Sequence, residues 1–210
     1  NITEKFYLLE DGDFAEITEN EIKIFNSNGE PVQREETKID ATPTSTSKGN
    51  YSHFMEKEIY EQPDALGNTI NGRLGEHDVL DNIFGLGSSD AFKNVKRIQF
   101  VACGTSLHAA KTARKWFEDI CEIPCYIDFA SEYRYRNPIV EDHTLFVTIS
   151  QSGETADTLA ALEYARAEKY IGIVTICNVP TSTMARNADW KIFTNAGPEI
   201  CLLYTSDAAD

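Results

Sequence analysis

The sequence predicts an α/β fold: a doubly wound, mostly parallel five-stranded sheet, preceded by a short β-meander and a polar linker. Two observations predict the sheet. From Lys96 onward, short apolar runs alternate with segments of helical periodicity, which is the pattern of repeated β–α–β units. These apolar runs are also continuous rather than alternating, as expected for parallel strands that helices cover on both faces.

The elements of the sheet domain follow from these runs. Strands are expected at 97–102, 125–129, 145–149, 171–176 and 190–193. Helices fit between them at 106–121, 155–168 and 182–188. The first helix has one apolar stripe, as an amphipathic helix on a sheet requires; it contains Leu107, Ala110, Ala113, Trp116, Phe117 and Ile120.

The beginning of the chain has a different pattern. Polar and apolar residues alternate at 21–25, and Asp-Gly and Asn-Gly turns bound the short apolar runs, which is the signal of β-hairpins. A meander this short buries little surface on its own. We therefore expect it to be the edge of a larger domain. Residues 36–50 are polar and have no periodicity, which indicates a linker. A helix is then expected to begin at His53 and to be interrupted at Pro63.

Charge and cysteine content exclude several functions. A net charge of −15 argues against nucleic acid or an anionic membrane as partner, and no apolar run approaches the ~20 residues of a membrane span. A small phosphorylated ligand remains possible, because backbone N–H groups bind anions locally. The five cysteines are unevenly spaced, and no His near Cys121 and Cys125 completes a zinc pattern. We therefore expect no metal and no other cofactor, and reduced cysteines.

Two loops that follow predicted strands consist of small hydroxyl residues and glycine. The first contains Cys103, Gly104, Thr105 and Ser106, and the second contains Ser150, Gln151, Ser152, Gly153, Glu154 and Thr155. Each opens a predicted helix, so unpaired N–H groups and hydroxyl donors converge where ligands bind in open α/β sheets. The sequence therefore predicts a phosphate-binding site at these two loops.

A simpler interpretation is that these residues only cap helices. Ser152 and Thr155 are both suitable cap residues, and for one loop alone this alternative would be preferred. Two such loops at equivalent strand ends favour the anion site. Cys103 adjoins the site, but no general base is visible beside it, so packing is its expected role.

Other polar residues near these loops have weaker support. His108 follows the first loop and is expected on the surface of the helix. Arg134 and Arg136 are candidates for contact with the ligand, yet salt links to Glu132 or Asp128 are at least as well supported.

Several longer motifs resemble one family. They are 101–106, 130–136 and 150–158, continued by 176–180 and 194–197 and preceded by 55–63. In this order and spacing they resemble the first sugar-isomerase (SIS) domain of glucosamine-6-phosphate synthases, also called glutamine–fructose-6-phosphate transaminases. Residues 1–35 resemble the tail of that family's glutaminase domain. The resemblance implies a flavodoxin-like SIS domain over 51–200 and an enzyme that makes glucosamine 6-phosphate from fructose 6-phosphate and glutamine.

The resemblance also assigns roles to residues. The sugar phosphate is held by residues that match Ser106, Ser150, Gln151, Ser152 and Thr155, with Thr105 at the same site. Gln151 is the position that the loop composition alone does not predict. The family's enzymes are cytoplasmic, and the resemblance implies a homodimer for the intact protein.

The chain also departs from the family. The glutaminase nucleophile and the second isomerase domain, which supplies the general base and an imine-forming lysine, have no counterpart here. We therefore expect no catalytic residue in this chain and glutamine use only through another domain. Residues 201–210 resemble nothing in the family, and we expect them to be a non-native tail.

Two rival functions remain. One is a non-catalytic sensor of phosphosugars, and the other is a sugar-phosphate isomerase or deglycase of the same superfamily. The glutaminase-like tail at 1–35 counts against both.

Overall fold

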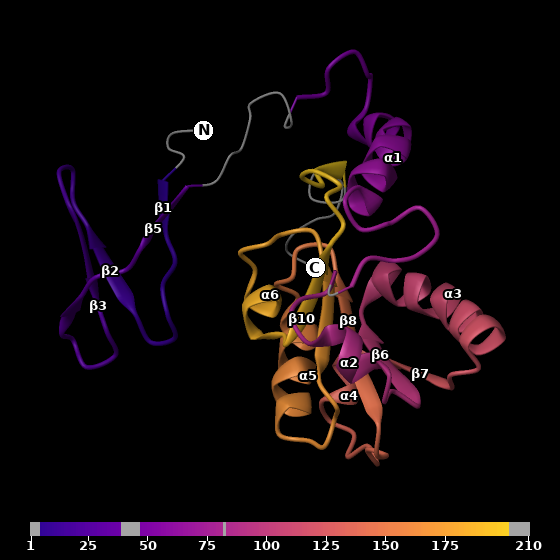
Figure 1. Ribbon diagram of the computed structural model, residues 1–210. Helices are drawn as coiled ribbons and strands as arrows, with labels where there is room; N and C mark the ends of the chain where they lie inside the picture. The colour runs from indigo at the N-terminus through magenta and orange to yellow at the C-terminus, as the bar shows by residue number, and fades with distance from the viewer. Residues whose placement is uncertain (1–4, 39–46, 82, 202–210) are drawn as a thin grey trace. The chain divides into compact units, whose positions relative to one another are not determined.

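The computed structural model describes residues 5–38, 47–81 and 83–201 (Figure 1). The chain divides into two compact units, Asn1–Tyr51 and Ser52–Asp210. Each unit is considered by itself below.

The first unit is an antiparallel β structure. Strands β2 (Phe14–Ile17), β3 (Ile22–Phe25) and β4 (Pro31–Val32) form a meander, and β1 (Lys5–Tyr7) pairs with β5 (Glu36–Lys38). The predicted meander is therefore confirmed. Its apolar side chains are mostly exposed, since Ile24 is buried but Ile17 is 74% exposed. So much apolar surface is unusual for a self-contained domain, and the glutaminase assignment of 1–35 stays a prediction.

The structure differs from the prediction at the start of the linker. Residues expected in the 36–50 linker begin with strand β5, whose backbone pairs with β1. The three residues Glu36, Thr37 and Lys38 are all polar, so this short strand gives no hydrophobic signal. Residues 39–46 of the predicted linker lie outside the described residues.

The second unit contains the predicted parallel sheet. Its five strands, in the order β10-β9-β8-β6-β7, are all parallel. This is the flavodoxin-like order, in which the chain turns back at the β6–β8 pair. The predicted strands are confirmed, with shifts of one or two residues at β8 and β9. The strands are β6 (Arg97–Ala102), β7 (Cys125–Phe129), β8 (Thr144–Ser150), β9 (Ile173–Cys177) and β10 (Trp190–Phe193).

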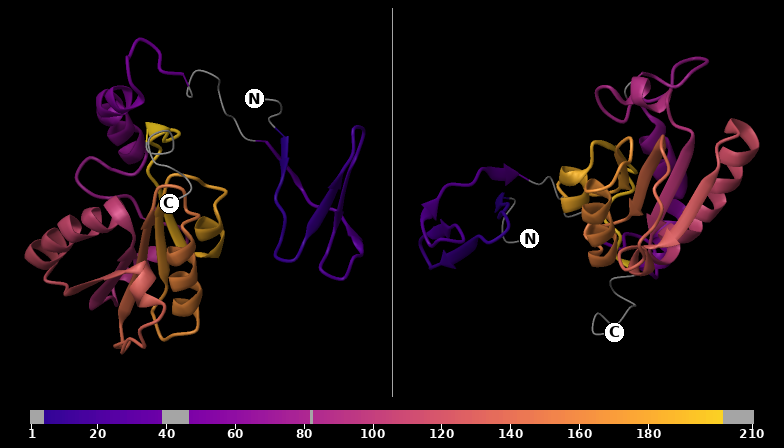
Figure 2. Two further views of the ribbon diagram at one scale, coloured as in Figure 1. Left: turned by 180° about the vertical axis from the view of Figure 1, so that it is seen from behind. Right: turned by 90° about the horizontal axis from the view of Figure 1, so that it is seen from below.

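Helices cover both faces of the sheet (Figures 1 and 2). On one face α3 (Gly104–Cys121) and α2 (Ser88–Phe92) pack over Ile98, Phe100 and neighbouring apolar residues. On the other, α4 (Ala130–Tyr133), α5 (Ala156–Arg166) and α6 (Thr183–Asn187) pack over Val101 and Phe146. Within the described ranges, no helix is both long and apolar enough to cross a membrane.

Helix α1 (Phe54–Ile70) corrects one expectation. Pro63 was expected to interrupt this helix, but the helix continues through it for seven more residues, to Ile70. Proline removes one N–H donor and leaves the carbonyl four residues earlier without its helical partner. Pro63 and Ile59 are both exposed, so that carbonyl lies on the side where water replaces the lost bond.

Candidate functional site

The two hydroxyl-rich loops lie side by side at the centre of the sheet. One follows β6 and the other follows β8, and these strands are direct neighbours with Ala102 opposite Ile149. The loops therefore leave the carboxyl ends of the two strands at which the chain direction across the sheet reverses. In open α/β sheets this is the position of the ligand crevice.

The first loop leads straight into α3. Cys103 is the N-cap residue of this helix, and its side chain makes no capping hydrogen bond. Gly104 has φ +53°, in the left-handed region that favours glycine. Thr105 is exposed and Ser106 is half-buried. The first turn of α3 contains no acidic residue, so nothing there opposes an anion at the positive end of the helix.

The second loop is organised around the buried hydroxyl of Ser150. This oxygen accepts a hydrogen bond from the Gly153 N–H at 3.1 Å and is hydrogen-bonded to the Thr155 hydroxyl, also at 3.1 Å. Ser152 accepts from the Glu154 N–H at 3.1 Å. Thr155 is the N-cap residue of α5, but its side chain makes no capping hydrogen bond. The hydroxyls predicted as alternative caps thus bond within the loop instead of closing the end of α5.

Gly153 fixes the second loop against α6. It has φ +68°, and a Cβ at this position would lie 2.2 Å from the Ser182 Oγ. The Gly153 carbonyl accepts from the Met184 N–H at 3.1 Å. Ser182 is buried and caps α6 by accepting from the Ala185 N–H. Ser182 was not predicted as a cap, although a serine at the first position of the helix predicted over 182–188 is a signal for one.

A side-chain contact joins the regions of the two loops. The Thr158 hydroxyl, buried in the first turns of α5, donates to the Cys103 Sγ at 3.9 Å. Cys103 begins the first loop and α5 follows the second, so this contact links the starts of the two helices. The packing role expected for Cys103 agrees with this position.

Gln151 connects the second loop to a small hollow of about 160 Å³. The Gln151 carbonyl accepts from the Asn178 N–H at 3.1 Å. Helix α1 and the chain after β10 supply the other walls of the hollow, which are formed by Glu58, Glu61, Gln62, Ala65, Ala196, Pro198 and Glu199.

The arginines near the site are paired with carboxylates. Arg136 binds Asp128 at 2.7 Å, as one alternative predicted, and Arg134 binds Asp157 at 3.4 Å rather than Glu132. Asp157 lies in the first turn of α5, so Arg134 partly neutralises a carboxylate that would otherwise repel an anion there. His108 is exposed on α3, as expected.

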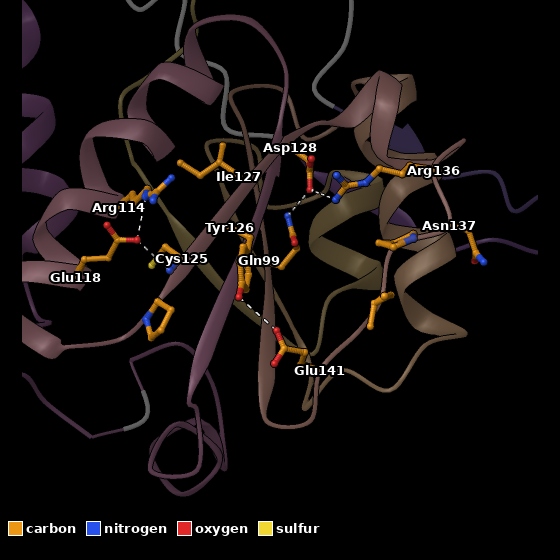
Figure 3. Close-up of a pocket in the computed structure, with 13 residues that line it drawn as sticks. Gln99, Arg114, Glu118, Cys125, Tyr126, Ile127, Asp128, Arg136, Asn137 and Glu141 are labelled. Atoms are coloured by element: carbon orange, nitrogen blue, oxygen red, sulfur yellow. Dashed lines mark hydrogen bonds and ion pairs between the residues drawn. The ribbon is translucent and has the colours of Figure 1, made fainter.

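A larger hollow of about 700 Å³ lies elsewhere, along the edge strand β7 (Figure 3). Its polar groups bind one another: Asp128 accepts from Gln99 at 3.0 Å and from Arg136 at 2.7 Å. None of the residues of the two loops lines it. We therefore place the candidate site at the loops and not in this hollow.

These features define the second unit as a doubly wound α/β domain with paired hydroxyl loops at its topological switch point. The family model of the SIS domain matches residues 91–208, more than half of the chain, and the chain belongs to this family.

Curated relatives agree with this family. The chain is 50% identical over 199 residues to the glutamine–fructose-6-phosphate aminotransferase (isomerizing) of Idiomarina loihiensis, and 47% identical over 199 residues to that of Pseudomonas aeruginosa. Each match covers 95% of this chain and 33% of the relative. The chain therefore spans about a third of the length of the curated relatives that it matches.

Solved structures show the same fold. The C-terminal domain of the glucosamine-fructose-6-phosphate aminotransferase from Francisella tularensis has a TM-score of 0.70 at 46% identity, covering 73% of this chain and 43% of that one. A glucosamine-6-phosphate deaminase from Thermotoga maritima has a TM-score of 0.52 at 19% identity, covering 68% and 40%. The second similarity shows the fold alone.

Proposed function

We propose that the loops 103–106 and 150–155 bind the phosphate group of a sugar phosphate. The observation that carries this proposal is that helices α3 and α5, which lie on opposite faces of the sheet, both begin at the switch point without a side-chain cap. Their first N–H groups are thus available to a ligand, and the aligned peptide dipoles favour an anion there.

The hydroxyl groups complete the proposed phosphate site. Ser152 and Thr105 are exposed, and Ser106 and Thr155 are half-buried, so all four remain accessible from the crevice. Hydroxyls donate to phosphate oxygens as well as accepting. Ser150 is buried and binds Gly153 and Thr155, so we assign it the role of holding the loop in place. Gln151 is included because it lines the adjoining hollow.

We further propose that the chain is the sugar-phosphate-binding part of a glutamine–fructose-6-phosphate aminotransferase. Support comes from identity of 46–50% over 95% of the chain to curated enzymes with that name. The ligands are then fructose 6-phosphate and the product glucosamine 6-phosphate. We assign the release of ammonia from glutamine, the general base and the imine-forming lysine to parts of the enzyme beyond the matched third, and we expect a cytoplasmic homodimer.

A titration tests the phosphate site. Backbone amide shifts are followed by NMR while fructose 6-phosphate, glucosamine 6-phosphate, inorganic phosphate or fructose is added. We expect shifts at Thr105, Ser106 and 150–155 with the two sugar phosphates and with inorganic phosphate, and none with fructose. A Ser152→Ala/Thr155→Ala double variant should lose them, whereas Thr112→Ala, an exposed hydroxyl on α3 outside the loops, should keep them.

The same titration separates the proposal from its rivals. A folded protein whose loops do not respond to any phosphorylated ligand at millimolar concentration would refute the phosphate site. Binding that favours another sugar phosphate over fructose 6-phosphate would support a sensor or a different isomerase instead of the aminotransferase.

A further inference from the structure

The segment 194–201, which follows β10, crosses the carboxyl end of the sheet as irregular chain. Asn195 and Gly197 have φ of +47° and +72°, so the backbone bends sharply here. Figure 1 shows the segment in yellow beside α1. Polar contacts from two different elements hold it in place.

The first element is the loop after β9, through Asn178. The Asn178 Oδ1 accepts from the Thr194 hydroxyl at 3.1 Å and from the Ala196 N–H at 2.7 Å, and its amide nitrogen donates to the Gly197 carbonyl. The backbone N–H of the same residue donates to the Gln151 carbonyl at 3.1 Å. Asn178 therefore ties the 194–201 segment to the second phosphate loop.

The second element is α1. Near its end, Thr69 donates to the Thr194 carbonyl, and Asn195 donates to the Asn68 carbonyl at 3.3 Å. One turn into the helix, the Glu58 Oε1 accepts from the N–H groups of both Ile200 and Cys201, each at 2.9 Å. Successive backbone N–H groups that converge on one oxygen form an anion-binding nest. Here the anion is the protein's own carboxylate, and it joins residues 142 positions apart.

These contacts shape the hollow beside Gln151. Residues 58–65 of α1 form one wall, and Ala196, Pro198 and Glu199 of the segment form another. At about 160 Å³ it is smaller than the roughly 300–1,000 Å³ of sites for drug-sized ligands, a size that suits one small sugar. A phosphate on the 150–155 loop would direct its sugar past Gln151 toward this hollow.

We propose that Glu58 is a positioning residue: by binding the N–H group of Ile200, the last residue before the tail expected at 201–210, it holds residues 194–200 opposite Gln151 and so forms the wall of the pocket for the sugar. The inference rests on the proposed function, because it assumes that the phosphate binds at the neighbouring loops. It adds a role for α1, which the loop chemistry does not use.

The charge at position 58 supports a role beyond simple packing. Burial and the nearby charge of Glu58 raise the pKa of Glu199, so the two carboxylates repel each other across the hollow. A neutral acceptor would make the same two hydrogen bonds without that repulsion. A carboxylate makes these two hydrogen bonds stronger. Stronger bonds are needed if the segment is to keep its position when a ligand binds against it.

Calorimetric titration of the full chain tests this inference. Wild type should bind fructose 6-phosphate more tightly than inorganic phosphate. Glu58→Ala should weaken fructose 6-phosphate binding by about tenfold, which corresponds to the loss of one charge-assisted hydrogen bond, and change inorganic phosphate binding by less than about twofold. Glu58→Gln keeps the acceptor oxygen but removes the charge, so it should recover only part of the lost affinity. Asp64→Ala removes the same charge from an exposed position of α1 and should change neither affinity.

Three outcomes would overturn the inference. They are unchanged fructose 6-phosphate binding in Glu58→Ala, equal losses for both ligands, and an equal loss in Asp64→Ala. An independent variant, Ala196→Leu, fills the hollow from the other wall and leaves the residue at position 58 unchanged. It should likewise weaken only fructose 6-phosphate binding, so the inference stays testable if Glu58→Ala does not fold. Wild type that binds neither ligand would instead refute the proposed function.

Discussion

The two loops of the proposed phosphate site have similar composition but are held in place very differently. The loop after β8 is fixed from within by Ser150 and from outside by the contact of Gly153 with α6. The loop after β6 is open: apart from Gly104 itself, its two chain neighbours and the nearby backbone of α3, no described atom lies within 4 Å of a Cβ built on Gly104. Thr105 is exposed. Hydroxyl and glycine content therefore predicts the proposed anion site, and packing fixes only the half of it that follows β8.

The two glycines should show this difference most strongly. Gly153→Ala is expected to lower the free energy of unfolding by about 3 kcal/mol, because a left-handed backbone and a collision with Ser182 both disfavour the new Cβ. Gly104→Ala should cost about 1 kcal/mol, because only the backbone strain applies. Urea denaturation measures both. Combining Gly153→Ala with Ser182→Gly should cost less than the sum of the single variants; equal costs for the two glycines would contradict the comparison.

Variants of Ser150 and Ser106 should separate the role of holding the loop in place from the role of binding the ligand. Ser150→Ala should lower the free energy of unfolding by about 1–2 kcal/mol, because the buried Gly153 N–H loses its acceptor. Ser106→Ala should change it by less than about 0.5 kcal/mol, as at other partly exposed positions. Both variants should weaken binding of fructose 6-phosphate in a titration. If Ser150→Ala is as stable as wild type, Ser150 does not organise the second loop.

Much of the fold follows from the sequence for a clear reason. Parallel strands covered on both faces are continuously apolar, so all five strands of the sheet were predicted within two residues. Short elements without such a signal were missed, namely β5, whose residues are polar, and α2 and α4, with five and four residues. Helix α1 was predicted to be interrupted at Pro63, because proline usually breaks a helix; on the exposed side of α1 it is tolerated.

The candidate site was predictable only in part. Its two loops follow strands and open helices, so local sequence places them at one edge of the sheet. The walls of the adjoining hollow depend on contacts between distant residues: Glu58 meets Ile200 across 142 positions, and Asn178 meets Ala196 across 18. The spacing of these residues along the chain does not predict their contacts. The roles proposed for Glu58 and Asn178 could therefore be inferred only from the folded structure.

Cysteine reactivity probes the open and the packed loop directly. Cys103 is half-buried at the start of the open loop, whereas Cys177 is buried behind the packed one. Burial raises the pKa of Cys177, so little of it is thiolate near pH 8. Iodoacetamide should therefore modify Cys103 at least about tenfold faster than Cys177, as followed by mass spectrometry. Exposed Cys121 is the reference, and Cys125, whose pKa burial raises to about 11, should react as slowly as Cys177.

Ligand protection sharpens this measurement. Fructose 6-phosphate should slow the modification of Cys103 and leave that of Cys121 unchanged. Equal rates for Cys103 and Cys177 in the free protein would mean that the first loop is as closed as the second.

The smallest expected effect concerns pH and the hollow beside the packed loop. Burial and the charge of Glu58 raise the pKa of Glu199 above its ordinary value, so the folded state holds this proton more tightly than the unfolded state. The resulting stability is complete below the ordinary carboxyl pKa and is lost as pH rises through the raised one. Urea midpoints between about pH 4 and pH 7 should show this loss in wild type, but less of it in Glu199→Gln.

Glu163→Gln, at an exposed position of α5, is the control and should retain the wild-type slope. An unchanged slope in Glu199→Gln would mean that the 194–201 segment does not pack against α1 in solution, and the wall opposite Gln151 would then form only when the ligand binds.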